Sequence, residues 1–222
     1  EAAADGAGQS PGDGGAAQGW PAAPPEPELP AVVLVVSGAH TDLVLMEDHR
    51  RFRLLGRTID DAAGEAFDKV ARLLGLGFPG GPYVERAARD GDARAFALPK
   101  AEPPGRYDVS FSGLKTAVLR LVRSLEARSS QGAPPPSTPG YAWPWVPDVA
   151  ASFQRTVNEM LAERVARAAA EFDVRTVMLG GGVAANLPLR EEISRRIARP
   201  LRVPPPELCT DNGAMIGAAA FY

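Results

Sequence analysis

An unbroken run of apolar residues, AVVLVV at 31–36, is typical of a strand that is buried on both faces of a sheet. Alternating apolar and polar residues over 42–46 and 51–55, on either side of a polar turn, predict two further strands. These three strands are expected to form an antiparallel meander. Short apolar runs at 176–179 and 201–203 predict two more strands near the end of the chain.

Between these strands the apolar spacing becomes helical. Apolar residues recur on one face over 63–74, and we expect Asp60 or Asp61 to cap the first turn of that helix. Glycines and prolines over 75–82 then form a rigid turn. A meander followed by alternating helices and strands predicts an α/β fold. Further helices are predicted over 84–90, 112–125, 149–172 and 187–197, with a small-residue helix from 213 to the end.

Two segments have compositions that do not suit a packed core. Residues 1–30 are almost entirely Ala, Gly, Pro, Asp, Gln and Glu, which cannot bury enough apolar surface to offset the entropy of ordering. We therefore expect a disordered linker over 1–30 and one lobe over 31–222. Within that lobe, the proline, serine and glycine residues of 129–147 predict a flexible loop.

Charge and cysteine content exclude several classes of protein. The net charge is −3, so the chain is not a polycation that coats nucleic acid, although a local basic face can still bind RNA. Cys209 is the only cysteine, which excludes a disulfide framework and favours the reducing cytoplasm. No apolar run approaches the roughly 18 residues of a membrane span. The chain starts at Glu1 without a signal-peptide pattern, so we expect an excerpt of a longer protein.

Two glycine-containing turns follow predicted strands and are candidate ligand sites. The turn at 37–39, Ser-Gly-Ala, allows close backbone approach and an anion-binding nest of N–H groups; a plain hairpin turn is the alternative. Three glycines at 180–182 end a strand and open a helix, which suits a phosphate or a purine. Their spacing matches neither G-x-G-x-x-G nor a P-loop. Asn186 is expected to cap the following helix, with ligand binding as the alternative.

Acidic residues on the predicted helix over 63–74 are further candidates. Glu65 and Asp68 lie three residues apart on one face, where a carboxylate can accept the hydroxyl groups of a sugar; a solvated acidic face is the alternative. Gly64 inside the same helix weakens it. This cost indicates that another group approaches the helix closely at that point.

Three polar residues outside these segments carry weaker hypotheses. Asp211 is a candidate metal ligand or a helix cap. The two histidines, His40 and His49, lack the spacing of a metal site. Lys115, at the start of a predicted helix, would either face an anionic substrate or be solvated.

Taken in order, six motifs resemble one family closely, the tRNA adenosine threonylcarbamoyltransferases of the actin-like, hexokinase-like ATPase superfamily. The resemblance covers residues 31 to 222 and therefore implies an α/β lobe of that superfamily, flanked by helices. No single glycine turn is specific, but the ordered set is. The motifs are LVVSGAHT at 34–41, IDDAAGEAFDK at 59–69, FPGGP at 78–82, SFSGLKT at 110–116, GGGVAAN at 180–186 and CTDNGAM at 209–215.

The resemblance implies transfer of a threonylcarbamoyl group from its AMP mixed anhydride to N6 of the adenosine beside the anticodon. It implies one divalent metal, iron or zinc, with Asp211 as a ligand. Asn186 would bind the adenine end, and Asp68, Gly81 and Glu85 would hold the ribose and its neighbours. The acyl-adenylate would also contact Val35, Val36, Ser37, Gly38 and Ala39.

The same resemblance implies several partners and a cytoplasmic enzyme with no membrane attachment. These are tRNA and accessory proteins, in bacteria an inactive paralogous subunit and a small ATPase. Binding of tRNA through its phosphates would be sensitive to salt. Candidate phosphate contacts are Lys100, Arg106, Lys115, Arg120 and Arg123.

This chain departs from the family pattern at two points. Ala39 replaces the second glycine of Ser-Gly-Gly-His-Thr, and a methyl group there would block a positive φ angle. The family's H-x-x-x-H metal motif and first phosphate loop should precede Ala31 and are absent, so we expect the 222 residues alone to be inactive. The alternatives are a sugar kinase or ATPase of the same superfold and a non-catalytic paralogous scaffold.

Overall fold

The computed structural model describes residues 26–129, 141 and 143–221. Most of the expected linker over 1–30, and residues 130–140 and 142 of the expected flexible loop, therefore lie outside the described residues. Among the described residues, no helix has the length and apolar character needed to cross a bilayer.

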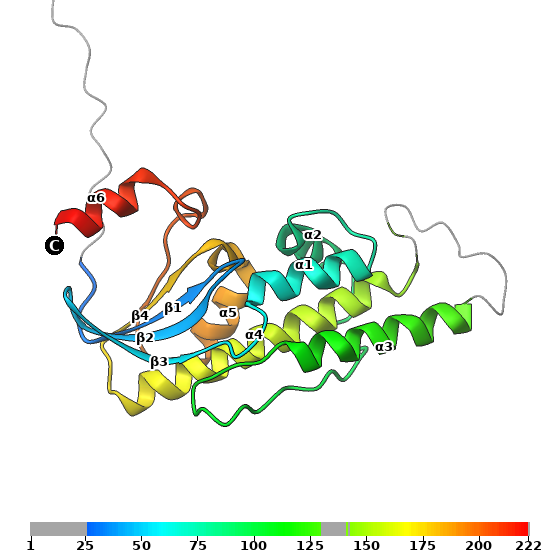
Figure 1. The fold of residues 1–222 in the computed structure, drawn as a ribbon, viewed down its shortest axis with the longest axis horizontal. Coiled ribbons are helices and arrows are strands. Elements are labelled where there is room, and N and C mark those ends of the chain that lie inside the picture. The colour runs from blue at the N-terminus through cyan, green and yellow to red at the C-terminus, as the bar shows by residue number, and fades with distance from the viewer. Residues whose placement is uncertain (1–25, 130–140, 142, 222) are drawn as a thin grey trace, which may run out of the picture.

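Within the described residues, five strands form one sheet in the order β3-β2-β1-β4-β5 (Figure 1). The central strand β1 pairs antiparallel with β2 and parallel with β4, and β5 continues the parallel side. This order confirms the predicted meander and the predicted α/β architecture. The strands are β1 (Ala31–Val36), β2 (Thr41–Asp48), β3 (Arg51–Arg57), β4 (Thr176–Gly180) and β5 (Leu201–Arg202).

In the part of the chain that the structure describes, six α-helices accompany the sheet, and helices α1 to α4 extend beyond its end (Figure 1). The predicted helices are all present, but the second begins at Gly80 rather than near Val84. The α-helices are α1 (Ala63–Leu73), α2 (Gly80–Ala88), α3 (Ser112–Ser129), α4 (Val146–Glu171), α5 (Leu187–Arg196) and α6 (Gly213–Phe221); the 3₁₀ helices are η1 (Gly182–Ala185) and η2 (Pro206–Leu208).

The core lies between one face of the sheet and the long helix α4. Val32, Leu34 and Val36 alternate along β1 toward this face and are almost fully buried. Phe67 of α1 packs edge-on against Phe153 of α4, with ring centroids 5.2 Å apart. This contact joins the helical end of the molecule to the helix that supports the sheet.

The predicted caps of α1 were wrong. Ala62 occupies the N-cap position without a side-chain cap, and the Thr41 hydroxyl oxygen instead accepts from the Ala63 N–H at 2.9 Å. Asp60 lies at the start of α3, where it accepts from the Phe111 N–H at 2.8 Å. A long-range contact has therefore replaced the local capping rule.

Asp61 is engaged in ion pairs that join α1 to α3. Its carboxylate lies 2.7 Å from the Lys69 ammonium and 2.9 Å from that of Lys115. Burial alone would raise the pKa of Asp61, but the two ammonium groups outweigh burial and lower that pKa. Lys115, predicted to be solvated or to face an anion, is instead partly buried and paired.

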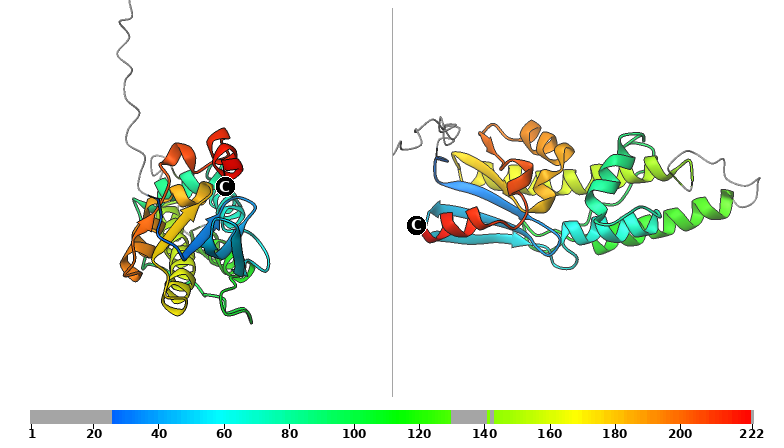
Figure 2. Two further views of the ribbon diagram at one scale, coloured as in Figure 1. Left: turned by 90° about the vertical axis from the view of Figure 1, so that its left-hand side faces the viewer. Right: turned by 90° about the horizontal axis from the view of Figure 1, so that it is seen from above.

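Helix α6 is set apart from the sheet and the other helices in the view of Figure 1, and Figure 2 shows it from two other sides. None of its residues is buried, although its sequence is mostly apolar. Its first turn is capped by Asn212, whose side-chain oxygen accepts from the Met215 N–H at 3.1 Å. Asp211, the residue predicted as a metal ligand or a cap, does not make this cap.

Candidate functional site

A cleft of about 320 Å³ lies where the parallel strands β1 and β4 end. The carboxyl ends of parallel strands are the usual ligand position in α/β sheets. The cleft brings together the two predicted glycine turns, through Gly38 and Gly182, with Gly64 of α1 and the start of α2. It is lined by Gly38, Gly64, Phe67, Asp68, Pro79, Gly81, Pro82, Glu85, Gly182, Val183, Ala185, Asn186 and Thr210.

The turn after β1 is a closed hairpin and not an open nest. The Ser37 N–H donates to the His40 carbonyl at 2.8 Å. The Ser37 hydroxyl oxygen accepts from the N–H groups of Ala39 and His40, at 3.3 and 3.1 Å. Those N–H groups are therefore engaged by the turn itself, as the alternative interpretation of this turn predicted.

Ala39 fits this turn without strain. Among the described residues, Asp173 is the one non-glycine residue with a positive φ angle. The concern that a methyl group at position 39 would block a positive φ was therefore wrong. Gly38 lines the cleft, whereas Val36 is fully buried behind it, and Val35, Ser37 and Ala39 are not among the lining residues.

The group that approaches Gly64 is the turn after β1. The Gly64 N–H donates to the Ser37 carbonyl at 3.0 Å. A Cβ at Gly64 would lie 2.7 Å from both the Gly38 Cα and the Ser37 carbonyl oxygen. The predicted close approach is thus confirmed, and it brings the first turn of α1 against the cleft loop.

Gly181, in the glycine segment at 180–182, packs directly against the end of β1. Its φ angle is +91°, and a Cβ there would lie 2.4 Å from the Val36 carbonyl oxygen. Both observations require glycine at this position. The following 3₁₀ helix η1 then leads directly into α5.

Asp68 joins α1 to α2 at the edge of the cleft. Its carboxylate accepts from the Gly80 N–H at 2.6 Å and so caps α2, which explains why α2 begins earlier than predicted. Glu65, the other member of the predicted acidic pair, forms an ion pair with Lys69 at 2.8 Å and does not line the cleft.

Asn186 makes the predicted helix cap and also contacts a second lining residue. Its side-chain oxygen accepts from the Leu189 N–H at 2.9 Å, which caps α5. Its side-chain nitrogen donates to Glu85 at 3.0 Å. The two predicted substrate residues therefore meet at the cleft, one from α2 and the other from the N-cap of α5.

Asp211 is exposed and lies next to Thr210, which lines the cleft. Within the described residues, no group of three or more His, Cys, Asp or Glu side chains is placed to hold a metal ion. Cys209 is buried and unpaired, as a small core residue. The described part of the chain thus offers Asp211 as a single donor and does not by itself fit a metal.

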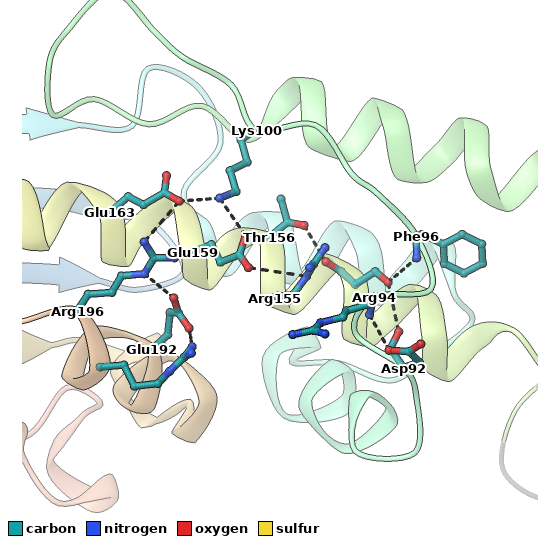
Figure 3. A network of polar contacts seen from close by, with 12 residues as sticks. Asp92, Arg94, Phe96, Lys100, Arg155, Thr156, Glu159, Glu163, Glu192 and Arg196 are labelled. Carbon is teal, nitrogen blue, oxygen red and sulfur yellow. Dashed lines mark hydrogen bonds and ion pairs between the residues drawn. The ribbon is translucent and has the colours of Figure 1, made fainter.

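The candidate phosphate contacts differ in how far their charge is already neutralised. Lys100 lies 2.6 Å from Glu163 and 2.9 Å from Glu159 within a polar network on α4 (Figure 3). Burial alone would lower the pKa of Lys100, but these carboxylates outweigh it and raise that pKa. Arg106 pairs with Glu171 at 2.8 Å. Arg120 and Arg123 are exposed on α3.

Sequence reasoning missed three residues around the cleft. Thr210 lines it, and its position beside Asp211 was an available signal. Gln154 and Asn158 contact the Asn186 side chain at 3.0 and 3.2 Å. These two are polar residues four apart in an otherwise apolar helix stripe, which places them on one face.

Fold and cleft together define one lobe of a protein of the actin-like, hexokinase-like class. The crystal structure of T. kodakarensis HypF agrees, with a TM-score of 0.58 at 14% identity over 86% of this chain and 34% of that chain. At this identity the likeness shows the fold alone.

Sequence comparison specifies the family. Residues 14–218 match the profile of TsaD, tRNA N6-adenosine threonylcarbamoyltransferase. Proteins of that name from Thermomicrobium roseum and Symbiobacterium thermophilum are each 55% identical, over 206 and 201 residues, covering 89% of this chain and 56% and 55% of those relatives. The chain belongs to the tRNA N6-adenosine threonylcarbamoyltransferase family, and it spans about 55% of the length of these relatives.

Proposed function

We propose that the protein transfers a threonylcarbamoyl group from threonylcarbamoyl-AMP to N6 of the adenosine beside the anticodon, in tRNAs that read codons beginning with adenine. Family membership supports the reaction. The observation that carries the proposal for this chain is that one cleft gathers Gly38, Gly64, Gly81 and Gly182 together with the carboxylates of Asp68 and Glu85. A nucleotide needs this combination of close backbone approach and hydroxyl acceptors.

In the proposed reaction the N6 amine attacks the acyl carbon of the mixed anhydride. A C–N bond forms, the C–O bond to phosphate breaks, AMP leaves with the electron pair, and the amine loses a proton. The residues of this chain hold the acyl-adenylate for this attack. Asp68, Gly81 and Glu85 hold the ribose, Asn186 lies at the adenine end, and Gly38, the residue of 35–39 that lines the cleft, adjoins the acyl-phosphate.

Metal, partners and compartment belong to the same proposal. Asp211 would supply one ligand of a divalent iron or zinc ion, which would act as a Lewis acid when bound. The other ligands would have to come from outside the described residues. We also propose tRNA as substrate, accessory proteins such as an inactive paralogue and a small ATPase as partners, and the cytoplasm as compartment.

The test is an assay of the intact natural protein with threonylcarbamoyl-AMP, its accessory proteins and unmodified tRNA. Mass spectrometry of the digested tRNA should detect threonylcarbamoyladenosine, and Glu85→Gln should reduce the yield. The 222 residues alone, with metal added, should yield none. ATP hydrolysis with hexose phosphorylation would instead favour the sugar kinase, and nucleotide-independent binding without transfer would favour the scaffold.

A further inference from the structure

The side-chain amide of Asn186 is held from four directions. Its nitrogen donates to Glu85 and to the Gln154 side-chain oxygen, both at 3.0 Å. Its oxygen accepts from the Leu189 N–H at 2.9 Å and from the Asn158 side-chain nitrogen at 3.2 Å. A carboxylate only accepts and a backbone N–H only donates, so turning this amide over would create two repulsive contacts. Its orientation is therefore fixed by its surroundings.

Gln154 and Asn158 reach Asn186 from one face of α4, where they lie one helical turn apart. Their exposed fractions are 7% and 3%. Within the described part of the chain, the side-chain oxygen of Asn158 is buried without a hydrogen-bond partner. An aliphatic side chain would avoid that cost. Burial of Asn158 therefore does not by itself stabilise the fold. We infer that its function is to donate the hydrogen bond to Asn186.

Glu85 has a competing partner outside the cleft. One carboxylate oxygen lies 3.5 Å from the exposed guanidinium of Arg89, the residue that follows the last residue of α2. Arg89 lines a separate hollow together with Glu85 and Gln154, and it is not among the residues of the cleft. Without the contact from Asn186, the ion pair with Arg89 would draw the carboxylate away from the cleft.

We propose that Gln154 and Asn158 are positioning residues for ribose recognition, because through Asn186 they hold the Glu85 carboxylate where it accepts ribose hydroxyl groups. This inference rests on the proposed function, which places an adenylate in the cleft. It assigns Asn186 a role beyond the adenine end, since its two donors and its oxygen are already engaged by protein groups. Buried contacts behind the site thus set the preference for ribose.

The experiment compares the affinity of the intact natural protein for AMP and for 2′,3′-dideoxy-AMP by calorimetry. The wild type should prefer AMP about tenfold, the scale of hydrogen bonds to a charged acceptor. Gln154→Met removes the acceptor and should lower this preference to about twofold. Asn158→Leu removes the donor and also the unpartnered oxygen. It should lower the preference while leaving the melting temperature unchanged or raised.

Thr156→Val is the matched control. Thr156 is also buried on α4, and its hydroxyl donates to the Ser152 carbonyl at 2.8 Å without contacting Asn186. This variant should keep the wild-type preference, whereas in Gln154→Met and Asn158→Leu KM for threonylcarbamoyl-AMP should change more than kcat. If Gln154→Met does not fold, Asn158→Leu decides the question alone.

Wild-type preference for AMP in Asn158→Leu and Gln154→Met would overturn the positioning role and leave the proposed function intact. An equal loss in Thr156→Val would overturn it too, because a general weakening of α4 would then explain the effect. A wild-type protein that binds neither nucleotide would overturn the proposed function and the inference together. Loss of preference confined to the two amide variants supports both.

Discussion

The hydroxyl oxygen of Thr41, the first residue of β2, accepts a hydrogen bond from the backbone N–H of Ala63, the first residue of α1, at 2.9 Å. Both residues are buried. The hydroxyl satisfies an N–H group that has no partner within the helix. This bond ties the meander to the helix that supports one side of the cleft.

Thr41→Val should therefore destabilise the protein by about 1–2 kcal/mol, because the buried Ala63 N–H loses its acceptor. Thr41→Ser keeps the hydroxyl and should recover most of this loss. Urea denaturation of both variants measures the difference. A Thr41→Val protein as stable as the wild type would show that this hydrogen bond does not contribute to stability.

Gly64→Ala should destabilise the protein by about 1–3 kcal/mol, since its Cβ would collide with the backbone of the turn after β1. Displacement of that turn should also weaken AMP binding. Gly217→Ala in α6 is the matched control, because a Cβ there meets nothing within 4 Å. It should be neutral or slightly stabilising. Thermal unfolding measures the change in stability, and calorimetry measures the change in AMP affinity. A Gly64→Ala protein with wild-type stability would contradict the close approach of Gly64 to the turn after β1.

Asp61→Asn should reduce the free energy of unfolding at pH 7 by about 1–2 kcal/mol, through loss of its ion pairs with Lys69 and Lys115. The folded-state pKa of Asp61 is lowered from 3.8. Its stabilisation is therefore complete above the unfolded-state pKa and is lost as the pH falls through the folded-state pKa. Urea denaturation across pH should show the two proteins converging in acid. A difference independent of pH would argue against the ion pairs as the cause.

Arg120→Ala combined with Arg123→Ala should weaken tRNA binding by the intact protein and reduce the slope of log affinity against log salt by about 2. Lys100→Gln should have a smaller effect on the slope, because Glu159 and Glu163 already neutralise Lys100. Filter binding at several salt concentrations measures both. A larger slope change for Lys100→Gln would place the tRNA on the α4 side instead.

Elements could be predicted from the sequence wherever local pattern decides the structure. The run at 31–36 became the central strand, and Asn186 became the cap of α5, because both depend on neighbouring residues. The caps at Asp60 and Asp61 failed because their partners, Phe111 and Lys115, are about 50 residues away. Local spacing does not encode such contacts.

In the candidate site, too, local motifs could be predicted from the sequence, whereas long-range contacts could not. The glycine segments and Asp68, Glu85 and Asn186 could be identified from motifs, and the cleft brings these three side chains together. Gln154 and Asn158 could be placed on one helix face, but their contact with Asn186 depends on how α4 packs against α5. The role of these two residues therefore follows from tertiary packing and not from the sequence pattern.

The central claim is that the cleft beside Gly81 holds the acyl-adenylate, and Gly81→Leu tests it most directly. Gly81 lines the cleft and a Cβ there meets nothing within 4 Å, so we expect a larger side chain to occupy the cleft. Gly113→Leu is the control, since Gly113 is likewise the second residue of its helix and equally free of neighbours, but lies outside the cleft.

The measurement is the rate of threonylcarbamoyl transfer to tRNA by the intact natural protein, with thermal unfolding recorded in parallel. Gly81→Leu should lose at least about tenfold in transfer through steric exclusion of the adenylate, while its melting temperature and the activity of Gly113→Leu stay at wild-type values. Wild-type transfer by a folded Gly81→Leu protein would contradict the account.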